Sequence, residues 1–383
     1  MHAPLYLDTA ATTPVRREVL EAMWPYLTGE FGNPSSHHGY GERAARAVQD
    51  ARAVVARHLG CRASEVVFTS GGTEADNLAV KGIALGAPRG RHLVTSPVEH
   101  EAVHESLDYL RRMHGFEVSV LAVDRDGIVD AEELAAVLRA DTTLVSIQHA
   151  SNEIGTVQPI RQLAAVAHAR GVPFHTDAVQ SAGALEVGLA TLGVDAVSIA
   201  GHKLGAPKGV GALAVRGSIV LEPVLHGGGQ ERGRRSGTEN VAGIVGLATA
   251  LSAARGEALR GAELTSVRDA LIDGVLARVP DAVLTGSRTE RLPNHASFCF
   301  PGTSGEAVLL ELEARGIVCS SGSACAAGSD EPSPVLLALG IAPAVAQTAV
   351  RFTVPEGFTG EQAAEVVDRV VAAVAAVSTL HTR

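Results

Sequence analysis

Lysine is scarce in this chain, and one lysine stands where a reactive amine is expected. Only Lys81, Lys203 and Lys208 occur among 383 residues. A deprotonated lysine amine can form a Schiff base with a carbonyl group, which an arginine cannot do. Lys203 follows the apolar run AVSIA (196–200), and ligands of parallel sheets bind at the carboxyl ends of strands. Lys203 is therefore a candidate cofactor lysine, with an ordinary loop lysine as the equal alternative.

The other two lysines have weaker contexts. Lys81 falls in the middle of an expected helix without polar neighbours, which favours a solvated surface position. Lys208 lies in APKGVG (206–211), a turn that leads into a strand.

Asp177 ends a second apolar run, PFHTD (173–177). A carboxylate at a strand end can pair with the ring nitrogen of a pyridine cofactor, keeping that nitrogen protonated and the ring electron-withdrawing. A plain helix N-cap aspartate is the alternative.

The segment TSGGTEADN (69–77) has the order strand, glycine-rich turn, helix. Backbone N–H groups of such a turn, together with the helix N-terminus, make an anion site. Gly71, Gly72 and Thr73 are therefore candidate phosphate-binding residues. A short glycine-rich turn also occurs without any ligand.

The four cysteines differ in context. They are Cys61, Cys299, Cys319 and Cys325, and none forms a CxxC pair, which favours free thiols in a reducing cytoplasm. Cys299 and Cys319 lie in apolar strands and are expected in the core. Cys325 lies in the small-residue loop SSGSAC (320–325), where a thiol is expected to be accessible. No basic residue is close to it in sequence, so its activation must come from the fold or the substrate.

The elements that must position these residues alternate between strand and helix. Helical spacing covers 42–59, 71–85 and 101–113, and strand-like runs cover 65–69, 92–96, 144–150, 173–177, 196–200 and 211–215. This alternation predicts βα units around a mostly parallel sheet.

From about residue 239 the pattern changes. A long Ala-rich helical stretch reaches about 279, followed by strand-like runs at 295–300, 316–320 and 349–354. We therefore expect an α/β fold with a large domain over 15–257, and a smaller α+β domain formed by 1–14 and 258–383 that carries the Cys325 loop.

Composition excludes several classes of protein. The 46% apolar content supports a core, and the net charge of −10 argues against a nucleic-acid binder. No run of 18 apolar residues predicts a membrane span, and the N-terminus does not resemble a signal peptide. We expect a cytoplasmic protein without a metal site.

Taken together, these segments resemble the cysteine desulfurases, the NifS/IscS-like branch of the class V aminotransferases. The similar segments are YLDTAATTPV (6–15), FGNPSSHHGYG (31–41), FTSGGTEADNLA (68–79), VEHEAV (98–103), SNEIGTVQP (151–159), HTDAVQ (175–180), GHKLGAPKGVGAL (201–213), GGGQERGRRSGTEN (227–240), SSGSACAAGSDEPS (320–333) and VRF (350–352). The segments RSGT and SSGSAC favour this branch over a general aminotransferase.

The resemblance implies a homodimer of the fold-type-I class that depends on pyridoxal 5′-phosphate (PLP). By motif position, Lys203 would hold the cofactor, Asp177 its ring nitrogen and Gln180 its ring hydroxyl, while His100 would stack on the ring and carry protons. The phosphate would be held by Gly72, Thr73 and His202, with Thr238 reaching it across the dimer interface. Asn152 and Arg351 would bind the substrate carboxylate.

Three positions depart from the family pattern. One is the turn GAPKG (205–209), where a GPKG-type turn with a larger preceding residue is usual. The family commonly has serine, which helps to bind phosphate, where this chain has Ala200. Ser198 is two residues away on the same strand face, and we do not expect it to substitute. After VRF, the segment TVPEGFTGEQ (353–362) lacks the Gly-Arg pair of many members.

The implied reaction removes sulfur from L-cysteine, leaving L-alanine and a persulfide on Cys325. The persulfide would pass to an acceptor protein, for example in iron–sulfur cluster assembly, which the sequence does not identify. A selenocysteine lyase, a plain aminotransferase and a non-catalytic sulfur-transfer scaffold are the alternatives. The intact Lys203, Asp177, His100 and Cys325 argue against the scaffold.

Overall fold

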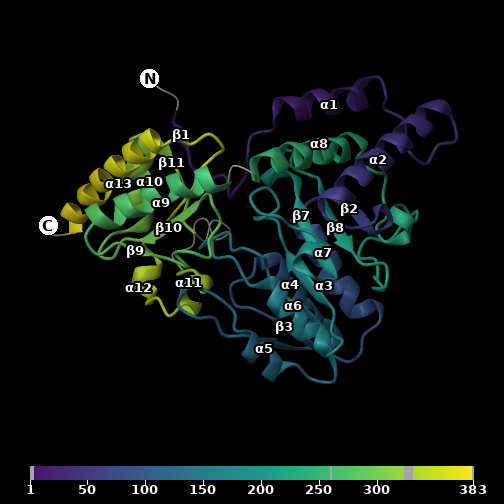
Figure 1. Ribbon diagram of the computed structural model, residues 1–383, viewed down its shortest axis with the longest axis horizontal. Coiled ribbons are helices and arrows are strands. Elements are labelled where there is room, and N and C mark those ends of the chain that lie inside the picture. Colours follow the sequence, from purple (N-terminus) through teal and green to yellow (C-terminus); the bar gives the residue numbers. More distant parts are fainter. Residues whose placement is uncertain (1–3, 259–260, 323–330, 382–383) are drawn as a thin grey trace.

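The computed structural model describes residues 4–258, 261–322 and 331–381. Figure 1 shows a large part built around a long sheet, and a smaller part that holds both chain termini.

A seven-stranded mixed sheet forms the centre of the large part. Its strand order is β2-β8-β7-β6-β5-β3-β4, and β8 alone runs against the others. The strands are β2 (Val66–Thr69), β3 (His92–Thr95), β4 (Glu117–Val120), β5 (Thr142–Ser146), β6 (Phe174–Asp177), β7 (Ala196–Ala200) and β8 (Gly211–Val215). Since each of these parallel strands ends at the same edge, that edge is where side chains from distant segments meet.

Helices cover both faces of this sheet, as alternation along the strands requires. In β2, Val66 and Phe68 belong to one core cluster, and Val67 belongs to another. The first cluster includes residues of α1 (Arg17–Thr28), α2 (Gly39–His58), α5 (Ala131–Val137), α6 (Ile160–Ala169), α7 (Leu189–Leu192) and α8 (Val241–Ala258). The second includes α3 (Gly72–Gly86) and α4 (Glu101–His114).

The smaller part has its own core. Phe298, Phe300 and Phe352 pack together there, with ring centroids about 6 Å apart. Its elements are β1 (Leu5–Tyr6), β9 (Val283–Leu284), β10 (His295–Cys299), β11 (Ile317–Val318), β12 (Ala349–Thr353), α9 (Gly261–Arg278), α10 (Gly305–Ala314), α11 (Pro334–Ala338), α12 (Pro343–Ala346) and α13 (Gly360–His381). Because β1 pairs with β11, the N-terminus belongs to this part, and we propose the division into 15–257 and 1–14 with 258–383 on this packing.

The expected α/β class is confirmed, and several details were wrong. The helical stretch expected over 239–279 is two helices: α8 packs on α1 and α2, whereas α9 packs on α13. The strand expected over 144–150 is Thr142–Ser146. Lys81 is not a lone solvated residue, because its amine donates to Asn77 Oδ1 at 2.6 Å and lies 4.5 Å from the centre of the Tyr109 ring.

A buried ion pair anchors the segment 226–240 to the sheet. Arg52 donates to both carboxylate oxygens of Glu231, at 2.6 and 2.7 Å, and both side chains are only 2% exposed. Glu231 also accepts the backbone N–H of Phe68 in β2 at 3.1 Å. Glu231 and Arg232 have φ angles of 49° and 58°, a costly conformation for residues other than glycine. The pair therefore holds a strained segment in place.

We expect Arg52→Met to lower the free energy of unfolding by about 3–5 kcal/mol, because it leaves the Glu231 carboxylate buried without its partner. Arg62→Met is the matched control: Arg62 also pairs with a glutamate, Glu65, but its side chain is 73% exposed. Its loss should be about 1 kcal/mol or less. Urea unfolding measures both, and equal effects would contradict the assignment.

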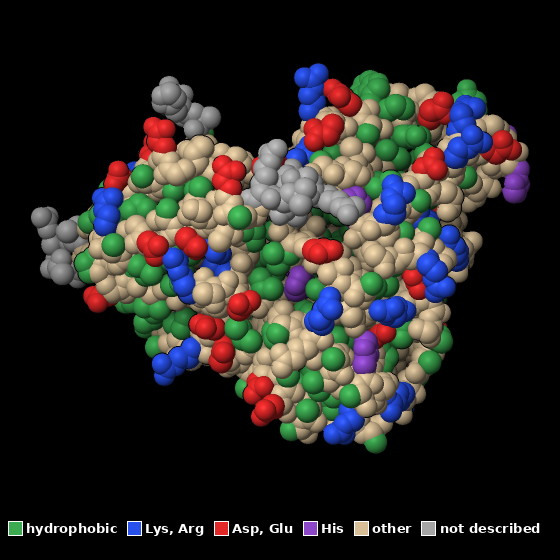
Figure 2. Space-filling model, in the orientation of Figure 1, with side chains coloured by type: hydrophobic (Ala, Val, Ile, Leu, Met, Phe, Trp, Pro, Cys, Tyr) green, Lys and Arg blue, Asp and Glu red, His purple; other side chains and the backbone are tan. Residues whose placement is uncertain are grey.

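No described helix is long and apolar enough to cross a membrane. Within the same residues, no group of three or more His, Cys, Asp or Glu could hold a metal ion. On the face shown in Figure 2, acidic and basic side chains are interspersed.

Candidate active site

The side chains predicted from the sequence gather at the carboxyl edge of the sheet. Asp177 is the last residue of β6, and Lys203 follows β7 in a short helix, η2 (Gly201–Lys203). His100 caps α4 beyond the end of β3, with its Nδ1 accepting the Ala102 N–H at 3.0 Å. Gly72 opens α3 just past β2. The fold thus places four separate motifs around one space.

The N-terminal segment 9–13 lies against the lysine. The Lys203 amine donates to the backbone carbonyls of Ala10 and Ala11, the latter at 2.8 Å. The amide of Gln180 also donates to the Ala10 carbonyl, at 3.0 Å. Lys203 and Gln180 therefore share one carbonyl, which brings two predicted site residues together.

The carboxyl of Asp177 is buried, and its Oδ1 accepts the Val179 N–H at 2.8 Å. Burial raises its pKa, while the neighbouring His100 and Lys203 act to lower it. A positively charged group that reached this carboxyl would stabilise its ionised form.

More buried ionisable groups lie beneath Asp177. Burial raises the pKa of Asp76, with the charge of Asp177 adding to the effect, and burial raises the pKa of Glu99 to about 8. His175 Nε2 lies 3.7 Å from Asp76 Oδ1 and 2.9 Å from Ser198 Oγ, and burial lowers the pKa of His175 to about 3. Burial therefore disfavours the charged forms of these neighbours, as it does for Asp177 itself.

A pocket of about 370 Å³ opens at the start of α3. Its lining contains Ala11, Thr12, Ser70, Gly71, Gly72, Thr73, Glu74, His202, Lys208 and Gly209. A Cβ atom at Gly72 would lie 2.7 Å from Val179, so the close approach there requires glycine. His202 Nδ1 lies 3.2 Å from Thr12 Oγ1, and its pKa falls to about 4, first through burial and then through Lys203 and Lys208. These hydroxyls, backbone amides and cation suit a phosphate group.

Arg351 in β12 is almost fully buried and tightly held. Its Nη2 donates to Asp8 Oδ1 at 2.7 Å, and its Nη1 donates to the backbone carbonyl of Asn152 at 3.0 Å. Its Nε is buried and has no hydrogen-bond partner among the described residues. Arg351 and Asn152, both predicted as carboxylate ligands, are thus in contact.

Cys325 lies outside the described residues. On either side of that segment, Ser333 Oγ donates to Glu153 Oε2 at 2.6 Å, and a Cβ atom at Gly322 would lie 3.4 Å from the same oxygen. Glu153 is the neighbour of Asn152 in sequence, so the described flanks of the segment approach the Arg351 side of the site.

Thr238 is not brought to the other predicted residues. Its side chain is exposed, and it lines neither of the two described pockets. Within one subunit it therefore takes no part in the site.

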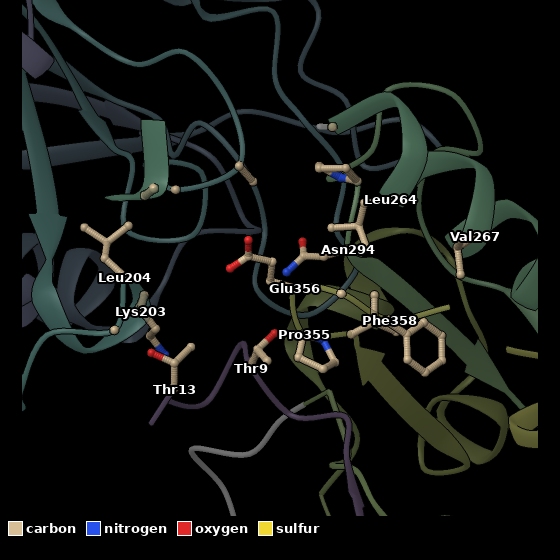
Figure 3. A pocket seen from close by; sticks show the side chains of 18 of the residues that line it. Thr9, Thr13, Lys203, Leu204, Leu264, Val267, Asn294, Pro355, Glu356 and Phe358 are labelled. Atoms are coloured by element: carbon tan, nitrogen blue, oxygen red, sulfur yellow. The ribbon is translucent and has the colours of Figure 1, made fainter. Parts of the chain in front are cut away.

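A larger cavity of about 560 Å³ lies between the two parts of the molecule. Figure 3 shows Lys203 and Thr13 on one side of it and Pro355 and Phe358 on the other. Lys203 thus borders the space between the two cores.

Sequence reasoning missed two residues of this site. Asp8, which pairs with Arg351, was only one letter of the YLDTAATTPV motif, and Lys208 was interpreted as a turn lysine. Two signals were available in the sequence. Asp8 is the one charged residue of its motif, and Lys208 is one of three lysines in the chain and is followed by glycine.

Fold and site together define an α/β protein with a strand-end lysine, a buried strand-end carboxylate and an anion pocket. The family model Aminotransferase class-V matches residues 5–362. The chain is 47% identical to the cysteine desulfurase IscS of Dictyoglomus turgidum, over 92% of this chain and 90% of that protein. A solved NifS-like protein superposes with a TM-score of 0.90 at 36% identity, covering 97% of this chain and 99% of that one. A structure described as SspA in complex with cysteine superposes with a TM-score of 0.80, also at 36% identity, covering 92% and 99%. The chain belongs to the class V aminotransferase family.

Proposed function

We propose that this protein is a cysteine desulfurase, which converts L-cysteine to L-alanine and passes the sulfur to an acceptor protein. The observation that carries the proposal is the convergence of Lys203, Asp177 and the anion pocket at one sheet edge, in a chain 47% identical to a protein of that name. The contact between Arg351 and Asn152 supports an amino-acid substrate, because a guanidinium group is a favourable partner for a carboxylate.

The residues present fit PLP. Lys203 would hold the cofactor through its amine, Asp177 would accept a hydrogen bond from the ring nitrogen, and the pocket at the start of α3 would take the phosphate. Gln180 would bind the ring hydroxyl, and His100, which influences Asp177, would stack on the ring. When bound, PLP withdraws electrons from the bonds around the substrate α-carbon.

Different side chains would bind the substrate, move its α-proton and accept its sulfur. Arg351 and Asn152 orient the substrate carboxylate, and the Lys203 amine removes the proton from the α-carbon. The thiolate of Cys325 attacks the substrate sulfur: the sulfur–sulfur bond forms as the carbon–sulfur bond breaks, and the electron pair stays with the carbon skeleton. The β-carbon takes up a proton and the Lys203 amine returns a proton to the α-carbon, giving alanine. Burial raises the pKa values of Cys61 and Cys319 to about 12 and of Cys299 to about 11, which makes these thiols poor nucleophiles and supports Cys325.

We also propose a homodimer. Large apolar side chains are exposed on α1, on the segment that follows it and at the start of α2: Leu20, Trp24, Leu27, Phe31 and Tyr40. A second copy would cover this surface and would explain the exposed Thr238, which would reach the partner's phosphate pocket. Sedimentation of the cofactor-loaded protein tests this, and an active monomer would reject it.

The direct test of the function is to incubate the purified protein with L-cysteine and a reductant and to measure sulfide and alanine. We expect both in equal amounts. Release of selenium from selenocysteine without sulfide from cysteine would favour the lyase, and amino-group transfer without sulfide would favour an aminotransferase.

Arg351→Lys should weaken L-cysteine binding about 10- to 100-fold, since lysine keeps a charge opposite Asp8 but offers no planar fork. Binding of cysteamine, which lacks the carboxylate, should change little. Titrations followed by cofactor absorbance measure both ligands, and an equal loss for the two would contradict the carboxylate role.

A further inference from the structure

The anion pocket at the start of α3 has no hydrogen-bonding side chain at position 200, and its lining includes Lys208, to which the sequence assigned no role. Ala200 is buried, and its methyl group would lie 3.4 Å from a Cβ atom at Gly72, so position 200 faces the glycine turn without a hydrogen-bonding group. Ser198 does not replace it, because its hydroxyl is fully buried and lies 2.9 Å from His175 Nε2. A phosphate bound here therefore receives no hydrogen bond from position 200 or from Ser198.

Among the charged residues that line the pocket, one is left as a cationic partner for a phosphate. Glu74 pairs with Arg235 at 2.7 Å, so its charge is neutralised by a residue outside the lining. His202 is mainly neutral at neutral pH, because its pKa is lowered to about 4. Among the described residues that line the pocket, Lys208 is then the remaining cation. A phosphate monoester carries about −1.5 to −2 charges at neutral pH and favours such a partner.

Backbone contacts hold the turn that contains Lys208 (205–211) against the glycine turn at the start of α3 (70–72). Gly211 opens β8, next to Thr69 at the end of β2. A Cβ atom at Gly211 would lie 2.7 Å from the carbonyl carbon of Gly71, so the two turns meet backbone to backbone. Gly205 and Gly209 have φ angles of 84° and 86°, left-handed values that place a tight turn around Lys208. Close packing therefore fixes the backbone of this turn beside the pocket, while the Lys208 side chain is exposed.

We propose that Lys208 is the cation that binds the cofactor phosphate, and that it supplies the interaction which Ala200 cannot. This inference rests on the proposed PLP site and adds a residue to it. Lys208 contributes affinity for the phosphate, so its removal should weaken binding of the cofactor.

The test uses full-length protein stripped of cofactor with hydroxylamine and titrated with PLP, with pyridoxal, which lacks the phosphate, and with inorganic phosphate. We expect Lys208→Ala to weaken PLP and inorganic phosphate binding about tenfold or more, and to leave pyridoxal binding unchanged. Lys208→Arg should lose less, because it keeps the charge. Ala200→Ser in the Lys208→Ala background should restore part of the PLP affinity.

Lys81→Ala is the matched control, because it removes the same charge from α3 at a site where the amine contacts Asn77 and Tyr109. It should bind PLP as the wild type does. Wild-type affinity of Lys208→Ala for PLP, or an equal loss for pyridoxal, would overturn the proposal. A wild-type protein that binds inorganic phosphate but not PLP would reject the proposed function, and the phosphate titration would still decide the role of Lys208.

Discussion

Lys203→Ala is expected to abolish attachment of PLP and to lower sulfide release from cysteine at least about a thousandfold. The amine has two duties in the proposed reaction, since it holds the cofactor and moves the proton at the substrate α-carbon, and general acid–base transfer alone is typically worth about 10²–10⁴-fold. Borohydride treatment of the wild type followed by peptide mapping should find the cofactor on the peptide that contains Lys203.

Two controls separate chemistry from folding. Lys203→Arg keeps a charged donor for the carbonyls of Ala10 and Ala11 but cannot bond to the cofactor, so it should fold and remain inactive. Lys81→Ala should keep both the label and the activity. A label on Lys208 or Lys81 in the wild type, or substantial turnover by Lys203→Ala, would contradict the assignment of Lys203 as the cofactor lysine.

The second large effect is a loss of sulfide release when the Cys325 thiol is replaced. Cys325→Ser and Cys325→Ala should bind PLP and respond to cysteine with a change in cofactor absorbance, yet release no sulfide above background. Everything needed to bind the cofactor and to activate the α-carbon lies elsewhere in the chain. Neither replacement can accept sulfur, because a serine hydroxyl has a pKa far above neutral and alanine has no nucleophile.

Cys319→Ser is the control for this experiment. Cys319 is partly buried, and its pKa is raised to about 12, so the folded variant should still turn over. Burying a hydroxyl at this position costs stability. Turnover of cysteine at the wild-type rate by the Cys325 variants would show that another group takes the sulfur. Activity of Cys325→Ala on selenocysteine alone would favour a selenocysteine lyase.

The elements that follow local rules could be predicted from the sequence. Short apolar runs bounded by turn residues predicted six strands of the large sheet but not the edge strand β4, and a glycine turn before an apolar helix predicted the start of α3. Because parallel strands end at a common edge, the sequence alone predicted that Lys203 and Asp177 lie near one another. The motif resemblance added roles for residues such as Gln180 and His202, which composition and spacing do not assign.

Contacts between distant segments depended on the tertiary structure. Asp8 and Arg351 are 343 residues apart, and Arg52 and Glu231 are 179 apart, and no local pattern pairs such residues. The split of the stretch 239–279 into α8 and α9 also follows from tertiary contacts, because each helix packs on a different core.

The sequence by itself thus determined which residues could do chemistry and on which elements they lie. Only the tertiary structure decided which carbonyls receive the Lys203 amine, which carboxylate holds Arg351, and which lysine lies beside the glycine turn. The physical reason is range: strand and helix periodicity is set by neighbours a few residues apart, whereas burial, pairing and pKa are set by whatever segments the packed cores bring together.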